Sequence, residues 1–158
     1  MTKTPRAPGS ALRTVLLDVD GTLIDSNDGH ARAWVGALRA HGYVVPFEQV
    51  RPLIGMGGDK LLPRVSGIES KSAKGKAIGR SRQQIFLERY LSKLRPFPGV
   101  RPFVKHLKER GKRVYVASSA QPEELCPLLE RAAASMSYGV SPTRTTCAAG
   151  SPERRSAA

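Results

Sequence analysis

Two carboxylates at alternate positions, Asp18 and Asp20, are the side chains of this sequence best suited to chemistry. They end an apolar run and are followed by Gly21 and Thr22. A β-strand directs residues i and i+2 to the same side, so both carboxylates would face one site. Two carboxylates that share a site can divide the work of a nucleophile and of an acid/base catalyst.

A second candidate segment lies about a hundred residues further along the chain. The β-branched run 114–117 ends in Ser118 and Ser119, and Pro122 then stands near the start of a predicted helix. The N-terminus of a helix offers unpaired N–H groups and the positive end of its dipole, and a serine adds a hydroxyl donor. This arrangement predicts a phosphate-binding site.

The spacing of apolar residues predicts the elements that hold these segments. Residues 14–19 form a near-continuous apolar run, typical of a strand buried on both faces of a parallel sheet. Helical periodicity predicts the amphipathic helices, and the Pro/Gly segment 95–99 separates them into two groups. The helices are expected over 27–41, from Pro46 to Leu53, from Leu61 to Gly67, over 69–94, over 100–111 and after 121.

The glycine-rich segment 54–60 is predicted to be a flexible loop that lies over a site. It lacks the glycine order of a dinucleotide-binding loop and follows no predicted strand, so that function is rejected. Gly55, Met56, Gly57 and Lys60 are the candidate substrate contacts in this loop.

Composition narrows the class of partner. The chain has 158 residues and a formal net charge of +13, but its densest basic group, Lys71 to Arg82, has no interleaved aromatic residues for stacking bases. A solvated helix face is therefore favoured over a nucleic-acid site. No apolar segment has the length of a signal peptide or a membrane helix, so a cytoplasmic protein is expected.

His30 and His41 are interpreted as helix-terminal or surface residues.

The string from Asp18 to Ser26, together with segments 54–60, 97–100 and 116–119, closely resembles the haloacid dehalogenase (HAD) superfamily. The most similar group contains phosphoglycolate phosphatase and β-phosphoglucomutase. The resemblance implies an α/β fold, a Rossmann-like parallel sheet core, here incomplete, with an inserted all-helical cap. The expected organisation is a leader at 1–13, a core at 14–26 and 97–131, a cap at 27–96 and a low-complexity, disordered tail at 132–158.

The resemblance also implies roles for single residues. Asp18 would attack phosphorus, and Asp20 would act as the general acid/base, its main-chain carbonyl joining Asp18 as a ligand of Mg²⁺. Ser118, with Ser119, Gly21 and Thr22, would bind the phosphoryl group. The implied partner is a small phosphorylated metabolite, whose identity the sequence does not specify, and the oligomeric state is equally open.

The family's third-motif basic residue and fourth-motif acidic pair have no counterpart here, because the last lysine is Lys112 and the last aspartate is Asp59. One hypothesis is a premature end or a shifted reading frame near residues 131–134, which would leave the first strand with an open, aggregation-prone edge. Three alternatives stay open: a phosphomutase, a phosphonoacetaldehyde hydrolase using a lysine such as Lys60, and a non-catalytic basic protein that binds an anionic ligand or nucleic acid.

Overall fold

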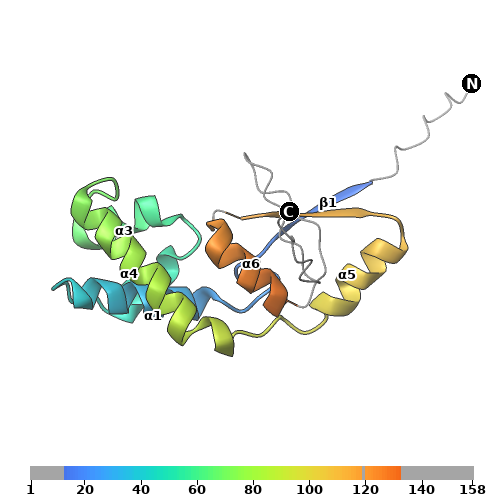
Figure 1. The fold of residues 1–158 in the computed structure, drawn as a ribbon, viewed down its shortest axis with the longest axis horizontal. Coiled ribbons are helices and arrows are strands. Elements are labelled where there is room, and N and C mark those ends of the chain that lie inside the picture. The colour runs from blue at the N-terminus through green and yellow to red at the C-terminus, as the bar shows by residue number, and fades with distance from the viewer. Residues whose placement is uncertain (1–12, 119, 133–158) are drawn as a thin grey trace, which may run out of the picture.

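The computed structural model describes residues 13–118 and 120–132, which form a helical lobe and a smaller lobe that carries the sheet (Figure 1). The expectations for the leader at 1–12 and the tail at 133–158 lie outside these residues. The helical lobe comprises α1 (Asn27–Ala40), α2 (Phe47–Val50), η1 (Arg51–Leu53), α3 (Gly58–Ser66), α4 (Ala73–Arg89) and η2 (Leu91–Lys93). The sheet lobe comprises β1 (Thr14–Asp18), α5 (Val100–Glu109), β2 (Arg113–Ala117) and α6 (Pro122–Arg131).

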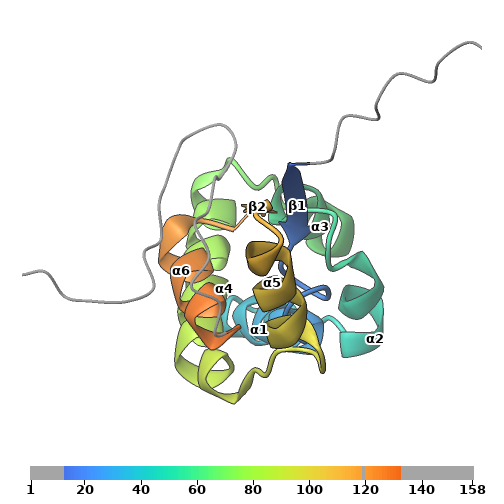
Figure 2. The ribbon, with the colours of Figure 1, turned by 90° about the vertical axis from the view of Figure 1, so that its right-hand side faces the viewer.

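The strands β1 and β2 pair in parallel, with Leu16 opposite Tyr115. Helices α5 and α6 lie on one face of this sheet (Figure 2), where Val114 and Val116 are buried. Burial of β1 on both faces was expected, and this is wrong for the described chain: Leu16 is 65% exposed. The reason is that β1 has β2 as its single neighbour among the described residues and no described helix covers the second face.

This open face leads to a prediction about self-association. Leu16→Lys is expected to change the free energy of unfolding by less than about 0.5 kcal/mol, because the side chain is exposed, and to reduce aggregation at the β1 edge. The same substitution at Leu17, which packs against the core, is expected to destabilise the protein. Urea titration and sedimentation velocity of both variants measure these effects. Unchanged aggregation of Leu16→Lys would contradict the prediction.

Helix α1 packs against α4 and begins and ends close to its predicted bounds. The predicted helix over 69–94 is shorter in the structure because α4 begins only at Ala73. Ser72 caps it by accepting a 3.0 Å hydrogen bond from the Gly75 amide. Gly75 lies so close to the preceding turn that a Cβ would stand 2.2 Å from the carbonyl oxygen of Glu69. The chain before Ser72 thus folds back over α4 instead of continuing it.

The glycine-rich segment was expected to be a loop as far as Lys60, and this is wrong in its second half. Helix α3 begins at Gly58, directly after Gly57, whose φ of 87° favours glycine. A Cβ on Gly58 would lie 2.8 Å from the Trp34 ring. The glycines therefore serve a sharp helix start and close packing on Trp34, and only residues 54–57 remain as a loop.

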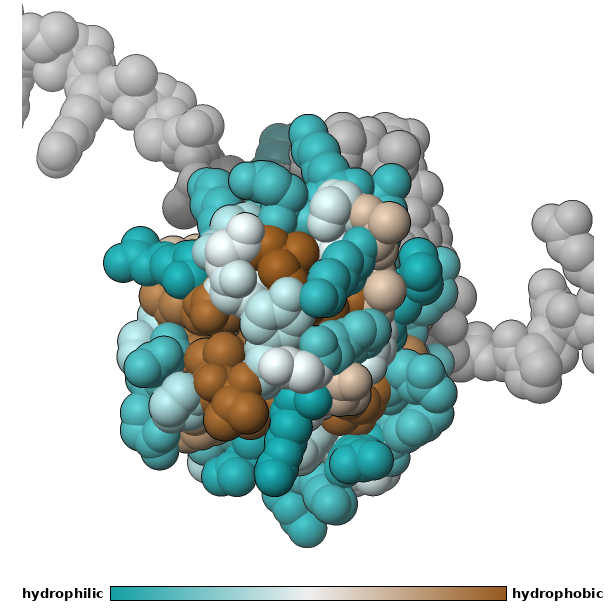
Figure 3. Space-filling model, turned by 90° about the vertical axis from the view of Figure 1, so that its left-hand side faces the viewer, coloured by the Kyte–Doolittle hydropathy of each residue, from teal (hydrophilic) through white to brown (hydrophobic). Residues whose placement is uncertain are grey.

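The end of the helical lobe is mostly hydrophilic, with a few hydrophobic patches between the polar side chains (Figure 3). Most of the basic group agrees with the expected solvated face: Lys71, Lys74 and Lys76 are exposed, and the Lys74 ammonium lies 4.7 Å from the centre of the Tyr43 ring. Arg82 does not agree with this expectation, because its side chain turns inward toward α6.

No helix of the described chain is long and apolar enough to cross a membrane.

Candidate active site

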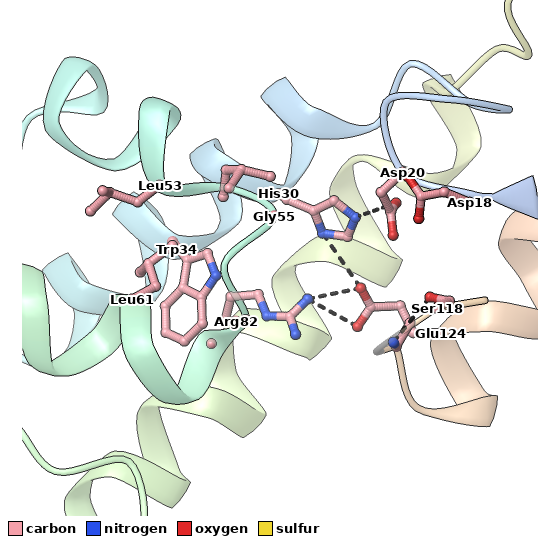
Figure 4. A pocket seen from close by; sticks show the side chains of 14 residues that line it. Asp18, Asp20, His30, Trp34, Leu53, Gly55, Leu61, Arg82, Ser118 and Glu124 are labelled. Atoms are coloured by element: carbon pink, nitrogen blue, oxygen red, sulfur yellow. Dashed lines mark hydrogen bonds and ion pairs between the residues drawn. The ribbon is translucent and has the colours of Figure 1, made fainter. Parts of the chain in front are cut away.

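A cavity of about 390 Å³ lies between the two lobes. The sheet lobe contributes Asp18, Asp20, Ser118 and Glu124 to its wall, and the helical lobe contributes His30 and Arg82 (Figure 4). The two chemical segments predicted from the sequence, one after each strand, thus meet in one cavity. They meet because parallel strands end at the same edge of a sheet.

A tight turn after β1 brings Asp18 and Asp20 into this cavity. Gly21 forms the turn with a φ of 74°, and a Cβ there would stand 2.4 Å from the side-chain nitrogen Nδ2 of Asn27, which would have to move. The positive φ is therefore the main reason that this turn favours glycine. Asp18 is exposed at the end of the strand, and one of its oxygens accepts a 3.0 Å hydrogen bond from the Thr22 hydroxyl.

The Asp20 carboxylate accepts more hydrogen bonds than that of Asp18 and is less exposed. One of its oxygens accepts hydrogen bonds from the Ser26 hydroxyl and, at 2.8 Å, from Nε2 of His30. Burial raises the pKa of Asp20, but the hydrogen bond and charge of His30, the Ser26 hydroxyl and the Arg82 charge outweigh it, so its pKa lies below the ordinary 3.8. Asp20 is therefore a carboxylate at neutral pH.

The lowered pKa of Asp20 makes its contribution to stability depend on pH. A depressed pKa stabilises the fold above the ordinary value of 3.8, and this contribution is lost as pH falls through the folded value. Asp20→Asn is expected to lower the free energy of unfolding by about 1–2 kcal/mol near neutral pH. Urea titrations at several pH values should show this difference shrinking in acid. Asp25→Asn, at an exposed site, is the control, and a pH-independent loss in Asp20→Asn would contradict the assignment.

A chain of ion pairs continues from Asp20 into both lobes. Nδ1 of His30 lies 3.4 Å from Oε1 of Glu124, and Nη1 of Arg82 donates to both Glu124 oxygens at 2.8 and 2.9 Å. The His30 ring also stacks on Phe86, with ring centres 4.0 Å apart and planes 8° apart. Four elements, the β1 turn, α1, α4 and α6, are thus joined by one polar network.

His30 was interpreted as a helix-terminal or surface residue. It does lie near the start of α1, but it is not at the surface, since it is 8% exposed. The sequence does hold signals for the missed residues. Arg82 stands midway between Ile78 and Phe86, at the i, i+4, i+8 positions of a buried stripe on α4. Glu124 likewise lies on the apolar side of α6, and it is 2% exposed. A charged residue inside an apolar stripe is the pattern that predicts a buried ion pair.

The four residues predicted to bind phosphate, Ser118, Ser119, Gly21 and Thr22, do not all lie at the cavity. Ser118 lines the cavity, and its oxygen accepts a 3.1 Å hydrogen bond from the Ala120 amide at the entry to α6, which leaves its O–H to donate. Thr22 contacts the Asp18 carboxylate, and Gly21 forms the turn. Ser119 lies outside the described residues.

The predicted loop contacts separate into two groups. Gly55 and Gly57 line the cavity, together with Gly58. Met56 does not line it and packs instead against the core of the helical lobe. Lys60 is exposed within the first turns of α3 and is absent from the cavity wall. The loop therefore presents its glycine backbone and the apolar side chain of Ile54 to the site.

The model of a protein family described as haloacid dehalogenase-like hydrolase matches residues 12–155 of the chain. The chain is also similar to Protein SUPPRESSOR OF QUENCHING 1, chloroplastic, from Arabidopsis thaliana, with 36% identity over 67% of the chain and 10% of that protein. A phosphoglycolate phosphatase of Caulobacter vibrioides is 31% identical over 67% of the chain and 46% of its own length.

Solved structures share the fold. A hydrolase from Pseudomonas syringae superposes with a TM-score of 0.70 at 22% identity, covering 79% of the chain and 59% of that structure. The chain therefore spans less than two thirds of each of these relatives. The α/β fold with a parallel Rossmann-like core, partial in the described residues, is confirmed by this likeness.

Proposed function

Because the chain belongs to the haloacid dehalogenase-like hydrolase family, we propose that it hydrolyses a small phosphomonoester through an aspartyl-phosphate on Asp18. The observation that carries the proposal is the meeting of Asp18, Asp20 and Ser118 in one cavity. Asp18 is the accessible carboxylate of the pair, whereas His30 and Ser26 hold Asp20 in place. This difference in environment supports attack by Asp18 and proton transfer by Asp20.

In the first step, an oxygen of Asp18 bonds to phosphorus, the bond from phosphorus to the ester oxygen breaks, and Asp20 gives that oxygen a proton. The low pKa of Asp20 requires that it first gain this proton. A phosphate dianion beside it raises its pKa by repulsion between like charges, so substrate binding itself favours the acid form. The Ser118 hydroxyl donates to a phosphoryl oxygen.

In the second step, the oxygen of a water bonds to the phosphorus of the aspartyl-phosphate, and the bond between phosphorus and the Asp18 oxygen breaks. Phosphate is released and the Asp18 carboxylate is restored. Asp20, now a carboxylate, accepts the proton from that water. The hydrogen bonds from His30 and Ser26 stabilise this carboxylate and aim it at the cavity. The same contacts that disfavour the acid form thus prepare the base form.

Members of this family generally use Mg²⁺, so we propose Mg²⁺ as the cofactor, with Asp18 and the main-chain carbonyl of Asp20 as its protein ligands. The described residues do not fit a preformed site: among them, no group of three His, Cys, Asp or Glu side chains could hold a metal. Mg²⁺ prefers octahedral oxygen coordination and often takes ligands from a substrate phosphate. We expect it to bind only together with substrate.

The proposal is tested by p-nitrophenyl phosphate hydrolysis with increasing Mg²⁺. The rate is expected to keep rising into the millimolar range and to fall to background with EDTA, because the described chain supplies few ligands. Restoring Mg²⁺ after EDTA is the control. Absence of turnover from protein that circular dichroism shows to be folded would overturn the proposed function.

No observation specifically favours either of the other two enzymes, the phosphomutase or the phosphonoacetaldehyde hydrolase. The cavity wall contains no lysine among the described residues, so none is placed to form the Schiff base of a phosphonoacetaldehyde hydrolase. The cavity is also lined by three carboxylates, Asp18, Asp20 and Glu124. A cavity lined by three carboxylates gives no specific support to a basic protein that binds anions through its net charge.

A further inference from the structure

The ion pair between Arg82 and Glu124 forms part of the cavity wall, between Trp34 and Ser118 (Figure 4). Its Nη1–carboxylate distances are 2.8 and 2.9 Å. The Glu124 side chain is 3% exposed and that of Arg82 is 21% exposed. A pair this close and this buried is held in one geometry, so it presents a fixed surface to any ligand.

Arg82 uses only part of its hydrogen-bonding capacity. A guanidinium has five N–H donors, and Glu124 occupies Nη1. Nε of Arg82 is buried with no hydrogen-bond partner, so a ligand does not reach it. The Arg82 side chain lines the cavity, and within the described residues its hydrogen bonds to Glu124 leave Nη2 unused. Arg82 can therefore offer the N–H groups of Nη2 to a ligand there.

The Arg82–Glu124 pair that offers these donors carries no net charge. Arg82 is the single lysine or arginine in the cavity wall among the described residues, and Glu124 neutralises it. A carboxylate or second phosphate on the ligand would find no unpaired arginine or lysine and would meet the Glu124 charge. An uncharged hydroxyl would find both donors and acceptors, because the pair offers N–H groups and carboxylate oxygens. Trp34 and Leu61 add an apolar wall for its carbon atoms.

We infer that the Arg82–Glu124 pair selects phosphomonoesters whose leaving group is an uncharged, hydroxylated molecule, so that the transferred phosphate is the substrate's sole anionic group. This rests on the proposed function and names the substrate class of the same site. Glu124 acts by cancelling the charge of Arg82. This preference for an uncharged leaving group differs from what the name of the Caulobacter relative implies. That relative is a phosphoglycolate phosphatase, and phosphoglycolate carries a carboxylate.

Two esters that differ only at this group test the inference. 2-Hydroxyethyl phosphate carries an uncharged hydroxymethyl group where 2-phosphoglycolate carries a carboxylate. The protein is expected to show a kcat/KM at least about tenfold higher for the hydroxyethyl ester. Glu124→Gln leaves the Arg82 charge unpaired and is expected to move the ratio toward phosphoglycolate by about 10- to 100-fold.

Two further variants separate charge from structure. Glu123→Gln removes the same charge from an exposed neighbour on α6 and should leave the ratio unchanged. The double variant Arg82→Gln/Glu124→Gln restores neutrality and should return the ratio to the side of the hydroxyethyl ester. Since Glu124→Gln alone could unfold, the wild-type ratio and the double variant each test the inference independently.

Binding without turnover separates this inference from the proposed function. Trp34 is the chain's single tryptophan and lines the cavity, so its fluorescence reports occupancy in the Asp18→Asn variant. Tighter binding of 2-hydroxyethyl phosphate than of 2-phosphoglycolate supports the inference even if the chain turns over no ester. Tighter binding of phosphoglycolate, or a ratio that Glu124→Gln does not move, overturns it while the phosphatase proposal stands.

Discussion

Asp18→Asn is expected to lower kcat for p-nitrophenyl phosphate hydrolysis by at least about 1000-fold, because an amide oxygen is a poor nucleophile toward phosphorus. The fold should survive, since Asp18 is exposed and its carboxylate has Thr22 as its one side-chain hydrogen-bond partner among the described residues. The effect is therefore expected in kcat while the urea midpoint stays close to that of the wild type.

The matched control is Asp25→Asn, the same change at an exposed carboxylate on the same segment. It should retain most of the activity, because Asp25 does not line the cavity. Equal activity of Asp18→Asn and wild type would remove Asp18 from the reaction. Equal losses in both variants would show that the assay reports the local fold and not the nucleophile.

Phe86→Ala is expected to have the largest effect on stability, a loss of about 3–5 kcal/mol in the free energy of unfolding. Phe86 is fully buried, belongs to the core that joins α4 to the sheet lobe and stacks on His30. Its removal leaves a cavity at the point where both lobes meet, so activity should fall as well.

Urea denaturation measures this loss, and Phe103→Ala provides the comparison. Phe103 is 48% exposed on α5, so the same truncation there should cost less than about 1 kcal/mol. A loss at Phe86 no larger than that at Phe103 would contradict the description of Phe86 as the link between the lobes.

Local sequence signals were enough to predict the ends of several elements, whereas the fold class was predicted from the family resemblance. The apolar run before Asp18 and the turn at Gly21 need only strand alternation and glycine stereochemistry. Helix α1 could be placed to within one residue because its apolar stripe and Gly42 mark its course and end. These features depend on residues close in sequence, which a pattern can show.

The polar network could not be predicted in this way, because it joins residues far apart in the chain. His30, Arg82 and Glu124 lie on three different helices. The apolar stripes around Arg82 and Glu124 indicate burial, but no single helix shows which residue each one pairs with. Their burial follows from how α1, α4 and α6 meet around Phe86. The exposure of Leu16 has a similar origin, since it depends on which strands and helices stand beside β1.

The covalent intermediate is the centre of this account, and a rapid acid quench tests it most directly. The protein is mixed with a phosphomonoester and Mg²⁺, quenched within one turnover and digested, and the peptide that contains Asp18 is analysed by mass spectrometry. We predict the added mass of one HPO₃ group on Asp18, absent from Asp18→Asn. Release of phosphate in the first turnover with no such adduct, or with the adduct on another residue, would contradict the account.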